Sequence, residues 1–339
     1  MRRIGVGIIG VGKAGRAQLE AILRLGFAEL RAIAVRDGER ARGLCEEFGI
    51  ARSFGDYREM LDDPGIEVLH NCTPNHQHFA INRAILESGK HLVSEKPLGL
   101  DSAESLILWR LAGEGKAVNA VNFVYRHHAL VQHLRGMIEA GELGTIRAVS
   151  GAYLQDWLLY DSDYDWRVEA ALGGASRAMA DIGSHWVDLA QFLLGRNVVE
   201  VCADFATFVP RRAKPGAGGP TMVEVDTEDY AAVLCRFEGG AHGSFTVSQA
   251  SAGSRLGLWI QVDGSLASAR WSQERAHELW IGHRDRANEV IVSHPSLLNA
   301  RALACCRVDG EGIERWPDAQ KSMIAAVYRS ILEGAEPSY

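Results

Sequence analysis

Features that would place the chain in a membrane or on nucleic acid are missing from its sequence. No apolar run approaches the roughly 18 residues that cross a bilayer. The apolar stretch 4–9 is short, contains glycine and is followed by Lys13 and Arg16, which predicts a first β-strand rather than a signal peptide. Basic residues are fewer than acidic ones, and the net charge is −7. We therefore expect neither a nucleic acid nor a membrane as partner.

Cysteines at the spacing of a metal site or a redox motif are missing as well. None of the six stands in C-x-x-C spacing, which argues against a zinc site and against a disulfide framework; they are Cys45, Cys72, Cys202, Cys235, Cys305 and Cys306. Free thiols in a chain of this size are typical of a reducing compartment, so we expect the protein to be cytoplasmic.

The sequence also lacks internal repeats and low-complexity segments, and its 339 residues, 47% of them hydrophobic, are enough for two ordinary cores. The first part alternates short apolar runs with amphipathic ones. Strands are predicted at 4–9, 29–35, 68–72, 91–94 and 117–120, and helices at 15–25, 38–48, 79–88 and 103–114. This alternation predicts a Rossmann-type α/β domain with a doubly wound parallel sheet over residues 1–122.

The pattern changes after Asn122, where long strands follow one another with few helices between them. Helices are predicted at 129–140 and 184–194, and strands at 145–154, 198–208, 230–237, 241–248, 256–262, 265–271 and 277–281. We therefore expect residues 123–339 to form an α+β domain with an open, mostly antiparallel sheet. Residues 210–220, with Arg211, Arg212 and Lys214, are predicted to be a mobile, solvated loop.

A glycine-rich loop, Gly10-Val11-Gly12-Lys13-Ala14-Gly15, joins the first strand to the first helix. In this context G-x-G-x-x-G predicts dinucleotide binding, because Gly10 allows the tight turn, Gly12 lets the backbone approach the pyrophosphate, and Gly15 lets the helix pack on the strand. The first helical turn, which contains Lys13 and Ala14, offers N–H groups to the phosphates.

The end of the second strand, Val35-Arg36-Asp37, bears on the choice between NAD and NADP. An acidic residue at its tip would bind the ribose of NAD, but Val35 occupies that place. Arg36 favours NADP because an arginine can receive the 2′-phosphate, whereas Asp37, one position further on, could still bind NAD. Both cofactors stay open.

Three further motifs, taken with the glycine loop, carry a family resemblance. They are Asn71-Cys72-Thr73-Pro74-Asn75-His76-Gln77-His78, Ser94-Glu95-Lys96-Pro97-Leu98, and Asp165-Trp166-Arg167 followed by Gly173-Gly174 and Asp181-Ile182-Gly183-Ser184-His185-Trp186-Val187-Asp188. In this order they resemble the family of glucose–fructose oxidoreductase, inositol dehydrogenase and MocA. Tyr153-Leu154-Gln155-Asp156-Trp157 resembles a branch that handles cyclic sugars.

The resemblance implies a dinucleotide-binding domain, an open α+β domain, an active site where the two meet, and a homodimer or homotetramer formed through the exposed sheet face. It also implies that Thr73, Pro74 and Asn75 line the cofactor with His78 nearby. Family members ordinarily continue into a final helix, whereas this chain ends soon after 321–334, so the second domain is expected to be short at its C-terminus.

The residue types suit the transfer of a hydride between a nicotinamide and a carbon that bears a hydroxyl group. His185 is the candidate base, and Asp181, four residues earlier, would orient it. Lys96, held extended by Pro97 at the end of a parallel strand, would donate a hydrogen bond to the reacting oxygen. Glu95 would tune this lysine or touch the cofactor, and Trp166 and Arg167 would reach its nicotinamide end.

Candidate substrate residues combine hydrogen-bonding groups with aromatic faces, which sugars require. They are Tyr125, Arg126, Tyr153, Gln155, Asp156 and Trp157, together with Asp181 and His185. No metal is expected, because the His76/His78 and His127/His128 pairs have no third ligand at a suitable spacing.

The predicted function is oxidation of a sugar, anhydrosugar or cyclic polyol, or reduction of the corresponding ketone. Two alternatives stay open: NADPH-dependent reduction of small carbonyls or oxidation of trans-diols, and a non-catalytic sensor of NAD(P).

Overall fold

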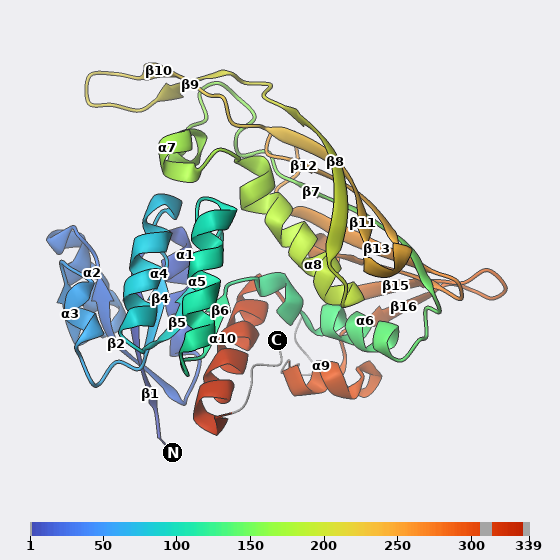
Figure 1. Ribbon diagram of the computed structural model, residues 1–339, viewed down its shortest axis with the longest axis horizontal. Helices are drawn as coiled ribbons and strands as arrows, with labels where there is room; N and C mark the ends of the chain where they lie inside the picture. The colour runs from blue at the N-terminus through green and yellow to red at the C-terminus, as the bar shows by residue number, and fades with distance from the viewer. Residues whose placement is uncertain (1, 306–313, 335–339) are drawn as a thin grey trace. The chain divides into compact units, whose positions relative to one another are not determined.

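The structure is a computed structural model that describes residues 2–305 and 314–334. It divides into two compact units (Figure 1). Of the described residues, 2–124 and 320–334 form the first unit, and 125–305 and 314–319 form the second. No helix in the described ranges is long and apolar enough to cross a membrane.

A six-stranded parallel sheet forms the centre of the first unit, with strand order β3-β2-β1-β4-β5-β6. Its strands are β1 (Ile4–Ile9), β2 (Ala28–Ala34), β3 (Arg52–Phe54), β4 (Val68–Asn71), β5 (His91–Ser94) and β6 (Asn119–Val121). Its helices are α1 (Lys13–Leu23), α2 (Gly38–Phe48), α3 (Arg58–Leu61), α4 (His78–Glu87) and α5 (Ser102–Glu114), and a 3₁₀ turn covers Asn75–Gln77. The predicted doubly wound sheet is confirmed.

Side chains that alternate along the strands fill two cores, one on each face of the sheet. On one face, Ile8 and Val68 pack with α1, α2 and α10 (Trp316–Glu333). On the other face, Ile9 and Leu69 pack with α3 and α4. Burying both faces explains why these strands are almost entirely apolar.

Local signals set the ends of the helices. Asp37 caps α2 by accepting hydrogen bonds from the backbone N–H groups of Glu39 and Arg40. Gly49 ends the same helix in the left-handed region, with φ of 66°. Asp101 caps α5 through the N–H of Glu104. These signals explain why the predicted helices lie close to the observed ones.

An eight-stranded mixed sheet dominates the second unit, with order β16-β15-β14-β13-β7-β12-β11-β8. Only the β12–β7 pair in this sheet is parallel, which confirms the mostly antiparallel prediction. The strands are β7 (Ile146–Leu154), β8 (Val198–Ala206), β11 (Tyr230–Phe237), β12 (His242–Ser248), β13 (Gly257–Gly264), β14 (Ser268–Ser272), β15 (Glu278–Gly282) and β16 (Glu289–Val292).

Helices pack on one face of this sheet. Trp186 of α8 (Ser184–Leu194) stacks on Phe245 of β12, with ring centroids 4.2 Å apart. The remaining helices are α6 (Ala129–Glu139), α7 (Ala170–Gly173) and α9 (Ala300–Cys305). Shorter helical turns cover Val124–His127, Trp166–Val168, Met179–Gly183, Glu238–Gly240, Gln273–Arg275 and Pro295–Leu297.

Two expectations need correction. Residues 210–220 are not simply a solvated loop, because β9 (Arg211–Lys214) and β10 (Thr221–Glu224) pair as an antiparallel hairpin (Figure 1). The side chain of Arg212 is fully buried and donates to backbone carbonyls of another segment. The composition of residues 210–220 does not indicate this burial, because these partners of Arg212 lie about 50 residues earlier in the chain.

The second correction concerns the C-terminal segment 321–334. It belongs to the helix α10, whose later part packs in the first unit rather than in the predicted domain 123–339. Tyr328 places its hydroxyl 2.7 Å from the ring of His70 on β4, and Ile324 and Val327 join the core around β1.

Candidate active site

The loop between β1 and α1 has the geometry that a pyrophosphate needs. Gly10 has φ of +83°, which favours glycine. A Cβ on Gly15 would lie 2.1 Å from the carbonyl oxygen of Gly10, so only glycine fits there, whereas a Cβ on Gly12 would meet nothing within 4 Å. No side chain caps the first turn of α1. The loop therefore fits a bound pyrophosphate, with open space above Gly12 and uncapped N–H groups beside it.

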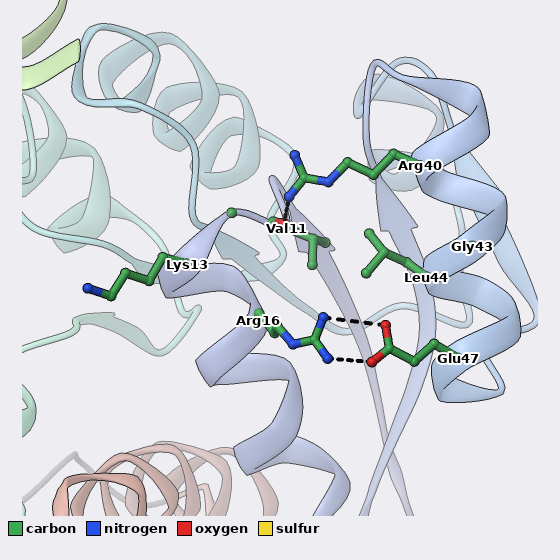
Figure 2. A pocket seen from close by; sticks show the side chains of 8 residues that line it. Val11, Lys13, Arg16, Arg40, Gly43, Leu44 and Glu47 are labelled. Carbon is green, nitrogen blue, oxygen red and sulfur yellow. Dashed lines mark hydrogen bonds and ion pairs between the residues drawn. The ribbon is translucent and has the colours of Figure 1, made fainter. Parts of the chain in front are cut away.

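A cavity of about 510 Å³ lies between α1 and α2, beside this loop. Figure 2 shows Arg40 reaching back from α2 to the carbonyl oxygen of Val11, 2.5 Å away, while Lys13 extends away from α2. Arg16 and Glu47 form an ion pair across the cavity. Arg40 was not predicted, although its position four residues after Arg36 could have signalled a second cation near the loop.

The residues at the tip of β2 leave the choice between NAD and NADP open. Arg36 is exposed, and Val35 stands where an acid would bind the ribose. Asp37 accepts the two N–H groups that begin α2 through one carboxylate oxygen, Oδ1. The carboxylate of Asp37 is therefore a helix cap.

His78 connects the two other strand-end motifs of the first unit. Its Nδ1 lies 2.6 Å from the carbonyl oxygen of Pro97, and its Nε2 lies 2.7 Å from that of Thr73. Burial lowers the pKa of His78. Asn71 also fixes this region, accepting from the Thr73 hydroxyl at 2.7 Å. The ring of His78 thus lies between the Thr73 and Lys96 loops and, when neutral, donates its one N–H to one of these two carbonyl oxygens.

Glu95 is nearly buried, and other side chains fix its carboxylate. Its Oε1 accepts from the amides of Gln18 at 2.6 Å and Asn122 at 2.7 Å. Asn122 is itself paired with Gln320 of α10. Glu95 therefore orients the loop that carries the half-buried Lys96, at the carboxyl end of β5.

In the second unit, Asp181 and His185 lie on one continuous helical segment. Asp181 sits in a π-helical turn, Met179–Gly183, which runs into α8, where His185 is the second residue. The groups that contact the Asp181 carboxylate include the amide of Gln249, 2.8 Å from Oδ2, and Nε of Arg167, 3.4 Å from Oδ1.

Two tyrosines lie beside the His185 ring. Tyr125 packs edge-on against it with ring centroids 4.9 Å apart, and the Tyr153 centroid lies 6.3 Å away. The two tyrosine hydroxyls are 2.7 Å apart. Burial raises the pKa of Tyr125 to about 12 and that of Tyr153 well above its usual value. Both therefore stay neutral hydroxyls at physiological pH.

A hydrogen-bonded chain leads outward from these tyrosines. The amide of Gln155 donates to the Tyr153 hydroxyl at 3.4 Å, and the indole of Trp157 donates to Gln155 at 2.7 Å. Four predicted substrate residues are thus brought together: Tyr125, Tyr153, Gln155 and Trp157.

Other predicted site residues have structural partners. Arg126 forms an ion pair with the buried Asp188, and its guanidinium lies over Phe192. Asp156 accepts from the backbone N–H of Gly253 at 3.2 Å. Arg167 stacks on Trp166, with 4.4 Å from its Cζ to the ring centroid.

Within the described ranges, no group of three or more histidine, cysteine, aspartate or glutamate side chains could hold a metal ion. The arrangement instead offers a dinucleotide cradle and a lysine in one unit, and a carboxylate, an imidazole and neutral hydroxyls in the other. Such a set belongs to an oxidoreductase that binds a nicotinamide cofactor.

Comparisons with known proteins agree with this class. Residues 4–123 match the model of an oxidoreductase family with an NAD-binding Rossmann fold, and residues 131–270 match the model of a GFO/IDH/MocA C-terminal domain. The chain therefore belongs to the family of glucose–fructose oxidoreductase, inositol dehydrogenase and MocA. The predicted family and the predicted NAD(P)-dependent dehydrogenase class are confirmed.

Several known proteins are similar to this chain over most of its length. Levoglucosan dehydrogenase from Pseudarthrobacter phenanthrenivorans is 31% identical over 83% of this chain and 76% of its own. A solved levoglucosan dehydrogenase in complex with NADH and L-sorbose has a TM-score of 0.91 and 28% identity, covering 99% of this chain and 92% of that one. An inositol dehydrogenase homologue from Azotobacter vinelandii, complexed with NAD⁺, has a TM-score of 0.87 and 29% identity, covering 98% and 88%. These neighbours give no support to a preference for NADP.

Proposed function

We propose that the protein oxidises a secondary alcohol of a sugar, anhydrosugar or cyclic polyol with NAD(P), or reduces the corresponding ketone. The observation that carries the proposal is the cluster around His185. A histidine packed against two neutral tyrosines, on the same helical segment as a hydrogen-bonded carboxylate, can accept a proton from an alcohol and return it.

The residues would divide the reaction between them. When bound, the nicotinamide supplies the acceptor for the hydride. His185 takes the hydroxyl proton, and Asp181 stabilises the charge that the imidazole acquires. Lys96 donates a hydrogen bond to the oxygen and stabilises its alkoxide character as the proton leaves. Glu95 and His78 keep the Lys96 loop in place through the contacts described above.

The substrate class follows from the polar groups near His185. Tyr125, Tyr153 and Gln155 combine neutral donors and acceptors, and Trp157 adds an aromatic surface. Hydroxyl-rich neutral rings need such a lining. Similarity to levoglucosan dehydrogenase favours an anhydrosugar as the first candidate.

The proposal for the cofactor is that either NAD or NADP binds in the cradle of the first unit. Arg36 and Arg40 lie at the start of α2, where cations would attract a 2′-phosphate. The NADH-bound neighbour and the family model favour NAD. Cofactor choice is therefore an outcome of the same assay.

Steady-state turnover of the purified chain tests the proposal. The substrates would be levoglucosan, other anhydrosugars, inositols and aldoses, each with NAD and with NADP. We expect turnover of at least one cyclic alcohol. Activity confined to small carbonyls with NADPH, or to trans-diols, would replace the sugar assignment, and cofactor binding with no turnover on any alcohol or carbonyl would favour the sensor.

We further propose a cytoplasmic homodimer or homotetramer that associates through the open sheet face of the second unit. Exposed apolar side chains on that sheet include Leu234, Val290 and Val292. Light scattering after size-exclusion chromatography measures the state directly. A monomer at micromolar concentration would refute the association.

A further inference from the structure

A fully buried charge cluster lies in the second unit, and its three residues belong to none of the sequence motifs. The carboxylate of Asp229 is paired with two guanidinium groups, those of Arg177 and Arg212, and none of the three side chains is more than 1% exposed. The second oxygen of Asp229 accepts from the backbone N–H groups of Phe208 at 2.7 Å and Val209 at 2.9 Å. We call Arg177, Asp229 and Arg212 the arginine–aspartate cluster.

One branch of this cluster leads to Asp181. Nη1 of Arg177 donates to Oε1 of Gln249 at 3.0 Å, and Nε2 of Gln249 donates to Oδ2 of Asp181 at 2.8 Å. A guanidinium carries only donors. Arg177 therefore requires the oxygen of the Gln249 amide to face it, and the NH₂ group must then face Asp181.

This amide is a directed contact on the Asp181 carboxylate. Gln249 is fully buried and directly follows β12, while Arg167 approaches the other oxygen from the Trp166–Val168 turn. Ionisable groups around Asp181 include Tyr125 and Tyr153, whose pKa values its charge helps to raise, and His185 lies on the same helical segment. Gln249 is thus a neutral donor that favours the ionised carboxylate.

The other branch of the cluster leads to the segment after Trp157. Arg212 donates to the carbonyl oxygens of Leu158 at 2.8 Å, Tyr160 at 2.8 Å and Asp163 at 3.2 Å. The same Asp229 oxygen thus faces the arginine that holds this segment and the arginine that orients Gln249.

We infer that Gln249 is a positioning residue for the dehydrogenase reaction: its amide orients Asp181, and the arginine–aspartate cluster fixes the direction of that amide. The inference rests on the proposed function, in which Asp181 supports His185. Stability alone does not require this arrangement, because apolar groups of similar volume commonly replace buried ion pairs without loss. Its specific consequence is the direction of one hydrogen bond.

Two variants of the full-length chain test the inference. Gln249→Glu keeps an acceptor for Arg177 but sets a carboxylate, in place of the amide donor, against Asp181. Gln249→Met removes both contacts without adding charge. Gln261→Glu is the matched control, because Gln261 donates to Asp263 on β13 and lies outside the His185 cluster. For each variant, kcat and KM would be measured from pH 5 to 10 with the best alcohol of the panel, alongside thermal unfolding.

We expect Gln249→Glu to move the acid limb of the kcat profile up by about one pH unit, because the added charge favours the protonated imidazole of His185. Gln249→Met should lower kcat about ten- to a hundredfold and change KM by no more than about twofold. The reason is that a misoriented Asp181 carboxylate lowers the rate of the chemical step more than it lowers the affinity for the substrate. The control should follow the wild type. If Gln249→Glu does not fold, Gln249→Met decides.

A folded Gln249→Met with wild-type kcat, or a folded Gln249→Glu with an unmoved acid limb, would overturn the inference while leaving the dehydrogenase assignment intact. Absence of turnover in the wild-type chain would instead overturn the proposed function, and the inference with it.

Discussion

Two alanine substitutions in the glycine loop should have opposite effects. Gly12 has φ of −79°, which alanine adopts easily, and its added methyl group would meet nothing within 4 Å. Gly12→Ala should therefore raise the free energy of unfolding by about 0.4–1 kcal/mol, because alanine restricts the unfolded chain. Gly15→Ala would place a Cβ 2.1 Å from the carbonyl oxygen of Gly10 and 3.2 Å from Cβ of Cys72. The backbone must move, at a cost of about 1–3 kcal/mol.

Cofactor binding should reveal what the open space above Gly12 is for. If the pyrophosphate occupies it, the methyl group of Gly12→Ala displaces the phosphate from at least one backbone N–H. A lost hydrogen bond to a charged group costs about 1.5–3 kcal/mol, which raises Kd for NADH about 10- to 150-fold.

Calorimetric titration with NADH, with unfolding followed by circular dichroism, measures both effects. The expected pattern is weak binding with intact stability in Gly12→Ala and reduced stability in Gly15→Ala. Wild-type affinity in a folded Gly12→Ala would refute the placement of the pyrophosphate on this loop.

Two further predictions concern stability. Burial lowers the pKa of His70 to about 3, so the unfolded chain binds a proton below about pH 6.5 that the folded chain does not bind. The stability that a neutral His70 contributes is therefore complete above pH 6.5 and is lost as pH falls toward 3. His70→Phe should reduce the slope of the unfolding free energy against pH, between pH 4 and 6, by about 1.4 kcal/mol per pH unit. The exposed His242→Phe should leave that slope unchanged, and an unchanged slope in His70→Phe would contradict the prediction. Asp229→Ala should destabilise the protein by about 3–5 kcal/mol, because it leaves two buried guanidiniums without their carboxylate. Glu224→Ala breaks an exposed pair with Arg211 on the hairpin that carries Arg212, and should change the unfolding free energy in urea by less than about 1 kcal/mol. Similar losses in the two variants would contradict the special cost of breaking the buried cluster.

Much of the fold is readable from the sequence because its signals are local. The 38–48 helix has both a capping aspartate and a terminal glycine, and the glycine loop follows a fully apolar strand. The hairpin at 211–224 and the return of α10 to the first unit were not predictable in this way. They depend on Arg212 and Tyr328, whose partners lie far away along the chain.

The candidate site shows the same division. Lys96, Asp181 and His185 stand in recognisable motifs, and the structure sets Asp181 and His185 on one helical segment. Gln249 and Arg177 carry no motif, since their significance lies in a pair of hydrogen bonds that connect separate segments. The ion pair between Arg126 and Asp188 likewise follows from three-dimensional packing and not from a local motif, and the substrate-binding role of Arg126 stays a prediction.

In the proposed reaction, His185 takes the hydroxyl proton and Lys96 stabilises the oxygen that loses it. The most direct measurement compares NADH affinity and kcat in the variants Lys96→Ala and His185→Ala, with the exposed Lys116→Ala as control. We expect near-wild-type affinity for NADH and a loss of kcat of at least about 100-fold in both variants, with no change in the control. Wild-type turnover in either folded variant would contradict it.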